Sequence, residues 1–165
     1  MGIEKVAIVT GGASGIGFEV VKSLLSDDWI VYILDLSAGS RETAASTNPK
    51  LYFIQVDVTN WASLSSSFDQ VFKAQGRLDF VFANAGILQL ENYYSRSDAL
   101  PPPEPRQNSI DINLKSVINT CYLAAQYFHA CQHPDKDAVI VLTASIASFV
   151  SPAHVCPGPC PVNTS

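Results

Sequence analysis

Short, continuous apolar runs alternate with segments of helical periodicity along most of the chain. A strand that is covered on both faces of a sheet is apolar at nearly every position, so the apolar runs predict strands. The intervening segments have the length of single helices, and alternating strands and helices indicate a doubly wound, parallel α/β sheet. We expect the strands at Lys5–Thr10, Trp29–Asp35, Leu51–Val56, Leu78–Asn84 and Ala138–Thr143.

The helical segments have apolar residues at the spacing of an amphipathic helix. One such pattern covers residues 16–25 and a second covers residues 64–72, where Thr59 or Asn60 could cap the helix. A longer helix is predicted after Pro105. Its buried stripe is expected to consist of Ile110, Leu114, Val117, Ile118, Cys121, Ala125 and Phe128.

Composition supports one domain, which we predict over residues 1–150. Of the 165 residues, 47% are hydrophobic and 15% are charged, as expected for a buried parallel sheet. Residues 151–165 are rich in proline and have no period, which predicts an irregular tail. The net charge of −5 argues against nucleic acid as a partner. No apolar run is long enough to cross a membrane, and no signal peptide is visible, so we expect a cytoplasmic protein.

The cysteines Cys121, Cys131, Cys156 and Cys160 are predicted to be free thiols, as is usual in the cytoplasm. His154 lies close to the last two of them, which raises the alternative of a zinc site. That segment is rich in proline and lacks a second pair of ligands at the usual spacing. We therefore expect no metal.

The most specific motif is Thr-Gly-Gly-Ala-Ser-Gly-Ile-Gly at residues 10–17, directly after the first predicted strand. Its first glycine permits a tight turn, its third lets the backbone approach a pyrophosphate, and its last lets the helix pack closely on the strand. Backbone N–H groups at the start of that helix attract an anion. The motif predicts a dinucleotide site with contacts from Gly11, Ser14, Gly15, Ile16 and Gly17.

Asp35 ends the second predicted strand, about twenty residues beyond the glycine turn. A carboxylate at this place can accept hydrogen bonds from the ribose hydroxyls of a dinucleotide, and it repels a 2′-phosphate. This residue therefore favours NAD(H) over NADP(H). Arg41 is close in sequence, so use of NADP(H) stays an open alternative.

Two further segments follow predicted strands and are expected at the same carboxyl edge of the sheet, where ligands bind in such folds. Asp57 and Val58 follow the third strand, and the aspartate could accept a hydrogen bond from an adenine amino group. Asn84, Ala85 and Gly86 follow the fourth strand, and the last two are small enough to leave room for a cofactor. Each segment alone could be an ordinary turn.

In this order, the segments resemble the short-chain dehydrogenase/reductase family over residues 5–149. Among the branches of this family, the sequences of these motifs are most similar to the eukaryotic branch that resembles 15-hydroxyprostaglandin dehydrogenase. The resemblance implies a Rossmann-type sheet with strand order 3-2-1-4-5. It also implies an oxidoreductase that moves hydride between NAD(P) and the carbon of a small alcohol or ketone substrate.

The resemblance further implies two catalytic residues. Asn113, in Ile-Asp-Ile-Asn, would hold a water molecule at the site, and Ser145, in Leu-Thr-Ala-Ser, would face a substrate oxygen. Each has a structural alternative. Asn113 could be an amide that is satisfied within the fold, and Ser145 could cap a helix or a turn.

The family's Tyr-x-x-x-Lys pair is absent, because none of the six tyrosines has a lysine four residues later. Gly158 and Val162 stand at the expected positions, so the fold is predicted to be truncated at its carboxyl end. An exposed sheet edge would then allow self-association, and the oligomeric state stays open. The alternatives to an impaired oxidoreductase are an inactive or vestigial dinucleotide-binding protein and a half-enzyme that a partner chain completes.

Overall fold

The computed structural model describes residues 4–37, 48–88, 97–131 and 138–145. The chain divides into two compact units. The first comprises Met1–Leu88 and Gln107–Thr143 and holds every strand and helix discussed below, and the second comprises Gln89–Arg106 and Ala144–Ser165. The predicted tail at 151–165, with its histidine and two cysteines, lies outside the described residues, as does Arg41.

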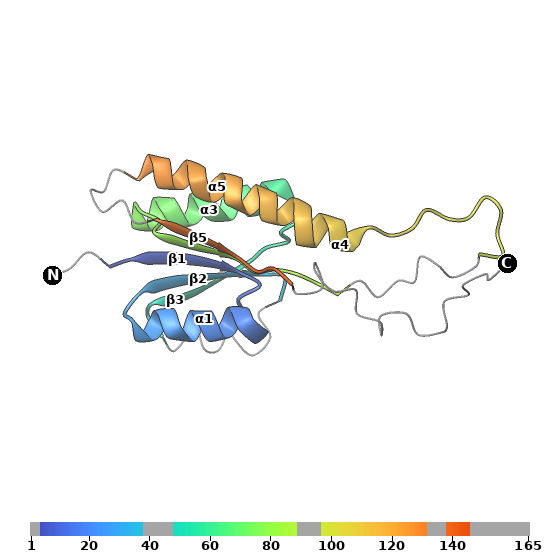
Figure 1. Cartoon of the computed structure of the whole chain (residues 1–165). Coiled ribbons are helices and arrows are strands. Elements are labelled where there is room, and N and C mark those ends of the chain that lie inside the picture. Colours follow the sequence, from blue (N-terminus) through green and yellow to red (C-terminus); the bar gives the residue numbers. More distant parts are fainter. Residues whose placement is uncertain (1–3, 38–47, 89–96, 132–137, 146–165) are drawn as a thin grey trace. The chain divides into compact units, whose positions relative to one another are not determined.

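The first unit is built on a sheet in which all paired strands run parallel, in the order β3-β2-β1-β4-β5 (Figure 1). This confirms the predicted Rossmann-type fold. Every expected strand is present, and the largest difference in a bound is at the start of β4, which begins at Phe80 instead of Leu78. The strands are β1 (Val6–Thr10), β2 (Ile30–Asp35), β3 (Leu51–Gln55), β4 (Phe80–Ala83) and β5 (Val139–Leu142).

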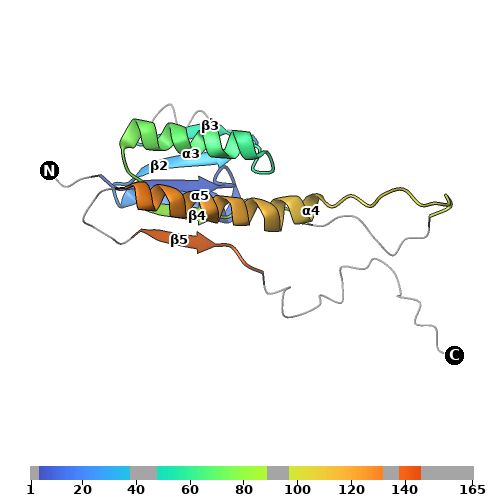
Figure 2. The ribbon, with the colours of Figure 1, turned by 90° about the horizontal axis from the view of Figure 1, so that it is seen from above.

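Helices cover both faces of this sheet. Helix α1 (Gly15–Ser26) lies on one face, and α3 (Trp61–Gln75) and α5 (Ser116–Ala130) lie on the other (Figures 1 and 2). All residues of β1 are buried as a result. The core on the side of α3 and α5 includes Phe68 and Val71. Burial of one such side chain contributes about 1.5–3 kcal/mol to the free energy of folding. Packing of the helices on both faces therefore stabilises the central strands.

Helix α3 has a capping residue at each end, as its local sequence allows. The side chain of Asn60 accepts a hydrogen bond from the Ser63 N–H at 3.0 Å, so Asn60 is the N-cap. The helix ends where Gly76 adopts a left-handed conformation with φ of 69° and donates its N–H to the Phe72 carbonyl. Of the two caps that the sequence allowed, the asparagine is the one used.

The long helical segment begins with α4 (Asn108–Ile110), continues through the π-helical turn η1 (Asp111–Lys115) and ends with α5. The predicted buried stripe is wrong for three of its residues. Ile110, Leu114 and Ile118 are 50%, 57% and 59% exposed. The buried residues of α5 lie on another face and are Ser116, Thr120, Leu123 and Ala124.

Two small hydroxyl residues explain this difference. The Ser116 hydroxyl donates to the Ile112 carbonyl at 2.5 Å, and the Thr120 hydroxyl donates to the Ser116 carbonyl at 2.8 Å. Their polar atoms are thus satisfied within the helix, so burial costs little. A prediction from hydropathy alone places serine and threonine on the solvent-exposed face of a helix. For this reason the predicted buried face of the long helix differs from the observed one.

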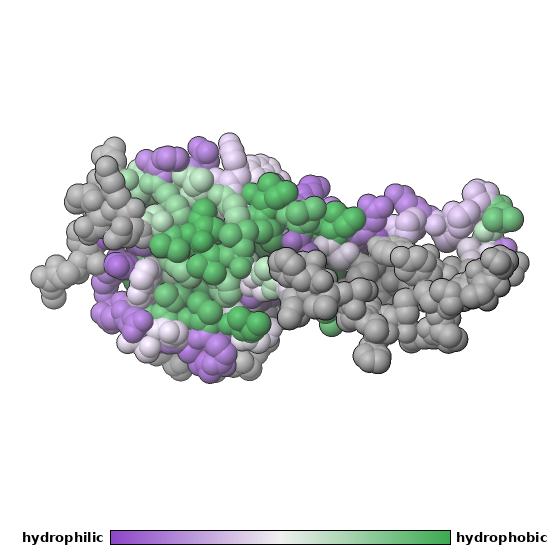
Figure 3. All heavy atoms as spheres, in the orientation of Figure 1, coloured by the Kyte–Doolittle hydropathy of each residue, from purple (hydrophilic) through white to green (hydrophobic). Residues whose placement is uncertain are grey.

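Strand β5 forms one edge of the sheet and pairs with β4. Val139, Val141 and Leu142 are 46%, 39% and 51% exposed, although each is apolar. Figure 3 shows a broad hydrophobic area on this side of the first unit. An edge strand with exposed apolar side chains is a template for pairing with another chain.

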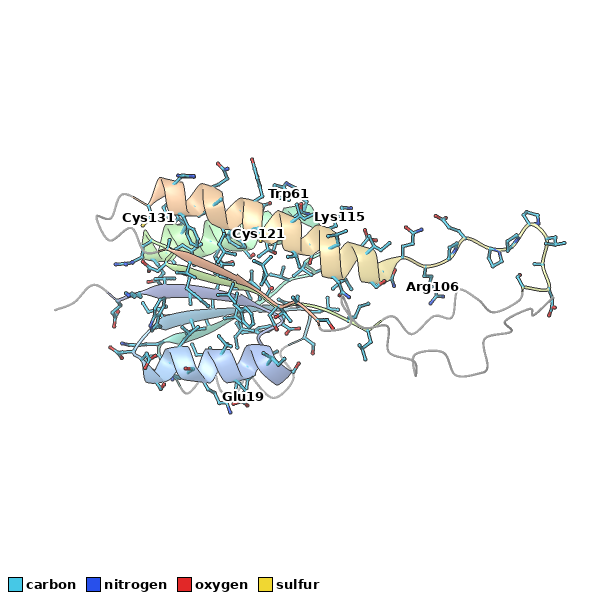
Figure 4. All side chains as sticks on the ribbon, viewed as in Figure 1. Glu19, Trp61, Arg106, Lys115, Cys121 and Cys131 are labelled. Carbon is cyan, nitrogen blue, oxygen red and sulfur yellow. The ribbon has the colours of Figure 1, made fainter. Side chains whose placement is uncertain are left out.

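Of the predicted free thiols, Cys121 and Cys131 are described, and both are free (Figure 4). Burial raises the pKa of the Cys121 thiol, which favours its protonated form. In the described part of the chain, no three metal-ligating side chains gather in one place. Among the helices described, none has the length and apolar character needed to cross a bilayer.

Candidate functional site

The glycine turn links the end of β1 to the start of α1, at the carboxyl edge of the sheet. Gly11 has φ of +65°, and a Cβ built on it would lie 2.8 Å from the Ala85 Cα. Only glycine therefore fits at that position. Gly15 has φ of +51°, and a Cβ there would meet nothing within 4 Å. The backbone at Gly15 thus faces open space, as the approach of a pyrophosphate requires.

The last glycine of the motif lies against the first. A Cβ on Gly17 would lie 2.7 Å from Nδ2 of Asn84 and would also overlap the Gly11 carbonyl oxygen. Gly17 is buried at this contact. The absence of a side chain therefore lets α1 begin directly against the end of β4, which supports the role in close packing that we predicted for Gly17.

The start of α1 has the electrostatic character of an anion site. Its first turn contains no acidic residue, and the N-cap Ser14 makes no side-chain capping hydrogen bond. The positive end of the helix dipole and the first backbone N–H groups are therefore left to an incoming anion. Ser14 is exposed, and Ile16 is 66% exposed, so both predicted contacts are accessible.

Thr10 joins β1 to the end of β4. Its hydroxyl oxygen accepts hydrogen bonds from the Asn84 N–H at 3.0 Å and the Ala85 N–H at 3.2 Å. Nδ2 of Asn84 donates to the Gly11 carbonyl at 3.2 Å. The hydroxyl of Thr143, just after β5, donates to Oδ1 of Asn84 at 2.8 Å. We had not predicted a role for either threonine, although Thr10 belongs to the glycine motif.

Asp35, at the end of β2, lies beside the glycine turn. Its Oδ2 accepts a hydrogen bond from the Ala13 N–H at 3.0 Å. The carboxylate is thus held at the edge where we predicted it, half-buried and next to the loop that precedes α1. The Asp35 carboxylate therefore lies on the same edge of the sheet as the N-terminus of α1.

Asp57 and Val58 follow β3 at the same edge. Oδ1 of Asp57 accepts hydrogen bonds from the N–H of Thr59 at 2.9 Å and from its hydroxyl at 2.7 Å, which is a local turn. Val58 is 8% exposed and belongs to the core. The segment therefore forms the local turn that the sequence allowed as the alternative to a ligand contact.

Asn113 lies in the π-helical turn η1 and fastens the segment after β4. Its Oδ1 accepts a hydrogen bond from the Ile87 N–H at 2.9 Å, and its Nδ2 donates to the Ile87 carbonyl at 2.8 Å. A Cβ on Gly86 would lie 3.4 Å from the same Oδ1. The amide is thus used within the fold, and it keeps a second N–H and a second lone pair for a further partner. Sequence reasoning missed Ile87, because backbone groups leave no signal in the side-chain pattern.

Ser145 is exposed and belongs to the second unit. The cofactor residues and Asn113 all lie in the first unit. The first unit combines a parallel sheet, a change of strand order beside β1 and a glycine turn with an open helix N-terminus at that point. These features define a Rossmann-type α/β protein, the class of fold in which dinucleotides bind at such a point.

The comparison with known families agrees with this class. The chain belongs to the short-chain dehydrogenase family, whose model matches residues 5–157. Members of this family bind NAD or NADP.

Two curated relatives and one solved structure illustrate the likeness. The short-chain dehydrogenase/reductase prx7 of Penicillium rubens is 40% identical over 149 residues, which cover 84% of this chain and 53% of that protein. The NADP-dependent dehydrogenase M3 of a Phoma species is 34% identical, over 88% of this chain and 47% of that one. The crystal structure of gox2181 matches with a TM-score of 0.73 and 27% identity, over 89% of this chain and 56% of that one. The chain thus spans about half the length of these proteins.

Proposed function

We propose that the chain is the cofactor-binding part of an NAD(P)-dependent oxidoreductase that moves hydride between nicotinamide and the carbon of a small alcohol or ketone. The observation that carries this proposal is the open space at Gly15 beside the uncapped N-terminus of α1. Backbone N–H groups of residues 15–17 would bind the pyrophosphate, Asp35 the ribose hydroxyls and Asp57 the adenine. Nicotinamide supplies or accepts the hydride when the cofactor is bound.

In this proposal, Asn113 holds a water molecule at the site, and Ser145 donates a hydrogen bond to a substrate oxygen. From the sequence of its motifs we also propose that the chain belongs to the branch that resembles 15-hydroxyprostaglandin dehydrogenase. We propose a cytoplasmic location as well. These 165 residues contain no Tyr-x-x-x-Lys pair, and we propose that by themselves they form an impaired enzyme. The alternatives are an inactive or vestigial dinucleotide-binding protein and a half-enzyme that a partner chain completes.

Cofactor preference tests the assignment of Asp35. We expect the protein to bind NADH more tightly than NADPH, because the carboxylate repels the 2′-phosphate. Asp35→Asn keeps an oxygen that can accept the Ala13 N–H but removes the charge. This variant should narrow the difference between the two cofactors about tenfold, which corresponds to about 1.4 kcal/mol.

Fluorescence titration at fixed salt measures both affinities. Asp35→Ala is the matched control, because it removes the charge and also the hydrogen bond to the glycine turn. It should weaken NADH binding more than Asp35→Asn does. Wild-type protein that binds NADPH as tightly as NADH would contradict the assignment, and the relative named as NADP-dependent makes this comparison informative.

We also propose that the exposed edge strand β5 causes self-association. A lysine on an edge strand opposes pairing with another chain, so Val141→Lys should shift the protein toward monomer in analytical ultracentrifugation. Ile118→Lys introduces the same charge on the exposed face of α5 and should leave the association unchanged. Loss of association in the α5 variant alone would assign the contact to that helix instead. A monodisperse wild-type monomer would contradict self-association through either β5 or α5.

A further inference from the structure

We propose that Thr143 is a positioning residue of the dinucleotide site and that it acts through the amide of Asn84. This inference rests on the proposed function. The Thr143 N–H donates to the Ala83 carbonyl at 3.1 Å, so the parallel pairing of β5 with β4 extends to this residue. The Thr143 hydroxyl then lies 2.8 Å from Oδ1 of Asn84.

The chemistry of the partners determines which way the Asn84 amide points. A backbone carbonyl can only accept hydrogen bonds, so the atom of Asn84 that lies 3.2 Å from the Gly11 carbonyl oxygen must be the nitrogen. The amide oxygen is then directed toward Thr143, whose hydroxyl is the donor. Without that hydroxyl, the amide loses the partner that holds its oxygen away from the glycine turn. A flipped amide would place two acceptor oxygens against each other at Gly11.

The position of this amide matters because it lies between the first and last glycines of the turn. A Cβ would lie 3.2 Å from Nδ2 of Asn84 if built on Gly11, and 2.7 Å from it if built on Gly17. A rotated amide would therefore displace the turn or the start of α1. The hydrogen bonds run from Thr143 through Asn84 to Gly11, across β5, β4 and β1. Through them, a residue on the edge of the sheet positions the loop that would bind the pyrophosphate.

The test compares Thr143→Val with Thr143→Ser in the full chain. Valine keeps the shape of threonine and its β-branch but removes the donor, whereas serine keeps the donor. NADH affinity is measured by fluorescence titration, and the side-chain amide of Asn84 is followed by ¹⁵N NMR without cofactor. We expect Thr143→Val to weaken NADH binding about threefold to tenfold, which is the range for loss of one neutral hydrogen bond. Thr143→Ser should stay close to wild type.

The NMR measurement separates this inference from the proposed function. In Thr143→Val the Asn84 amide resonances should shift and exchange faster with water, and in Thr143→Ser they should not. An unchanged Asn84 amide in the valine variant would overturn the inference, as would equal losses of affinity in the two variants. If no variant binds NADH and the wild type does not either, the proposed function fails. If, in addition, the Asn84 resonances do not change in Thr143→Val, the positioning role of Thr143 is overturned as well.

Discussion

A polypeptide of these 165 residues, supplied with NAD(H), is expected to turn over secondary alcohols or ketones about 10²–10⁴-fold more slowly than a dehydrogenase with a complete acid–base pair. This loss corresponds to about 3–5 kcal/mol of barrier. No tyrosine of the chain has a lysine four residues later to lower its pKa. Burial instead raises the pKa of Tyr32 and of Tyr127. A serine hydroxyl such as that of Ser145 is too weak an acid to replace the missing phenol.

The measurement is nicotinamide absorbance with purified protein and a panel of alcohols and ketones. Ser145→Ala is the control. Because the turnover rate of the unsubstituted protein is expected to be very low already, this substitution should have little effect on it. Turnover at the rate of an ordinary dehydrogenase that is abolished by Ser145→Ala would contradict the expectation, since another residue would then supply the proton. Activity that appears only after addition of a second chain carrying Tyr-x-x-x-Lys would support the half-enzyme.

Gly17→Ala should weaken NADH binding at least about 100-fold, which corresponds to about 2.7 kcal/mol. The new methyl group would lie 2.7 Å from Nδ2 of Asn84 and would overlap the Gly11 carbonyl oxygen. The first follows β4 and the second belongs to the turn, and the two are hydrogen-bonded to each other, so the start of α1 must move away from the sheet. That movement displaces the backbone N–H groups that would bind the pyrophosphate.

Gly76→Ala is the matched control for this substitution. Gly76 ends α3 with φ of +69°, and a Cβ there would meet nothing within 4 Å. Its replacement should lower the stability of the protein by about 1 kcal/mol through backbone strain, and NADH affinity should not change. Thermal denaturation and fluorescence titration of both variants separate the two effects. Equal NADH affinity in Gly17→Ala and the wild type would show that the turn does not bind the cofactor.

The sequence by itself determined the parallel sheet and the place of the glycine turn. Both depend on local patterns: strands buried on both faces must be apolar throughout, and a tight turn with positive φ requires glycine. The sequence also narrowed the cap of α3 to Thr59 or Asn60, and the structure shows that Asn60 is used. The position of Asp35 beside the glycine turn was predictable, because Asp35 ends β2 and parallel strands bring their carboxyl ends to one edge of the sheet.

Only the tertiary structure decided which groups meet at that edge. The links from Thr143 to Asn84 and from Asn113 to Ile87 join residues that are 59 and 26 positions apart, and they depend on strand register and on backbone groups. The tertiary structure also decided the buried face of η1 and α5. Ser116 and Thr120 satisfy their hydroxyls within the helix, while Leu114 of η1 and Ile118 of α5 are exposed. Hydropathy records the preference of each side chain for water. It does not record whether a hydrogen-bond partner is within reach, and in this protein that partner decides which polar residues are buried.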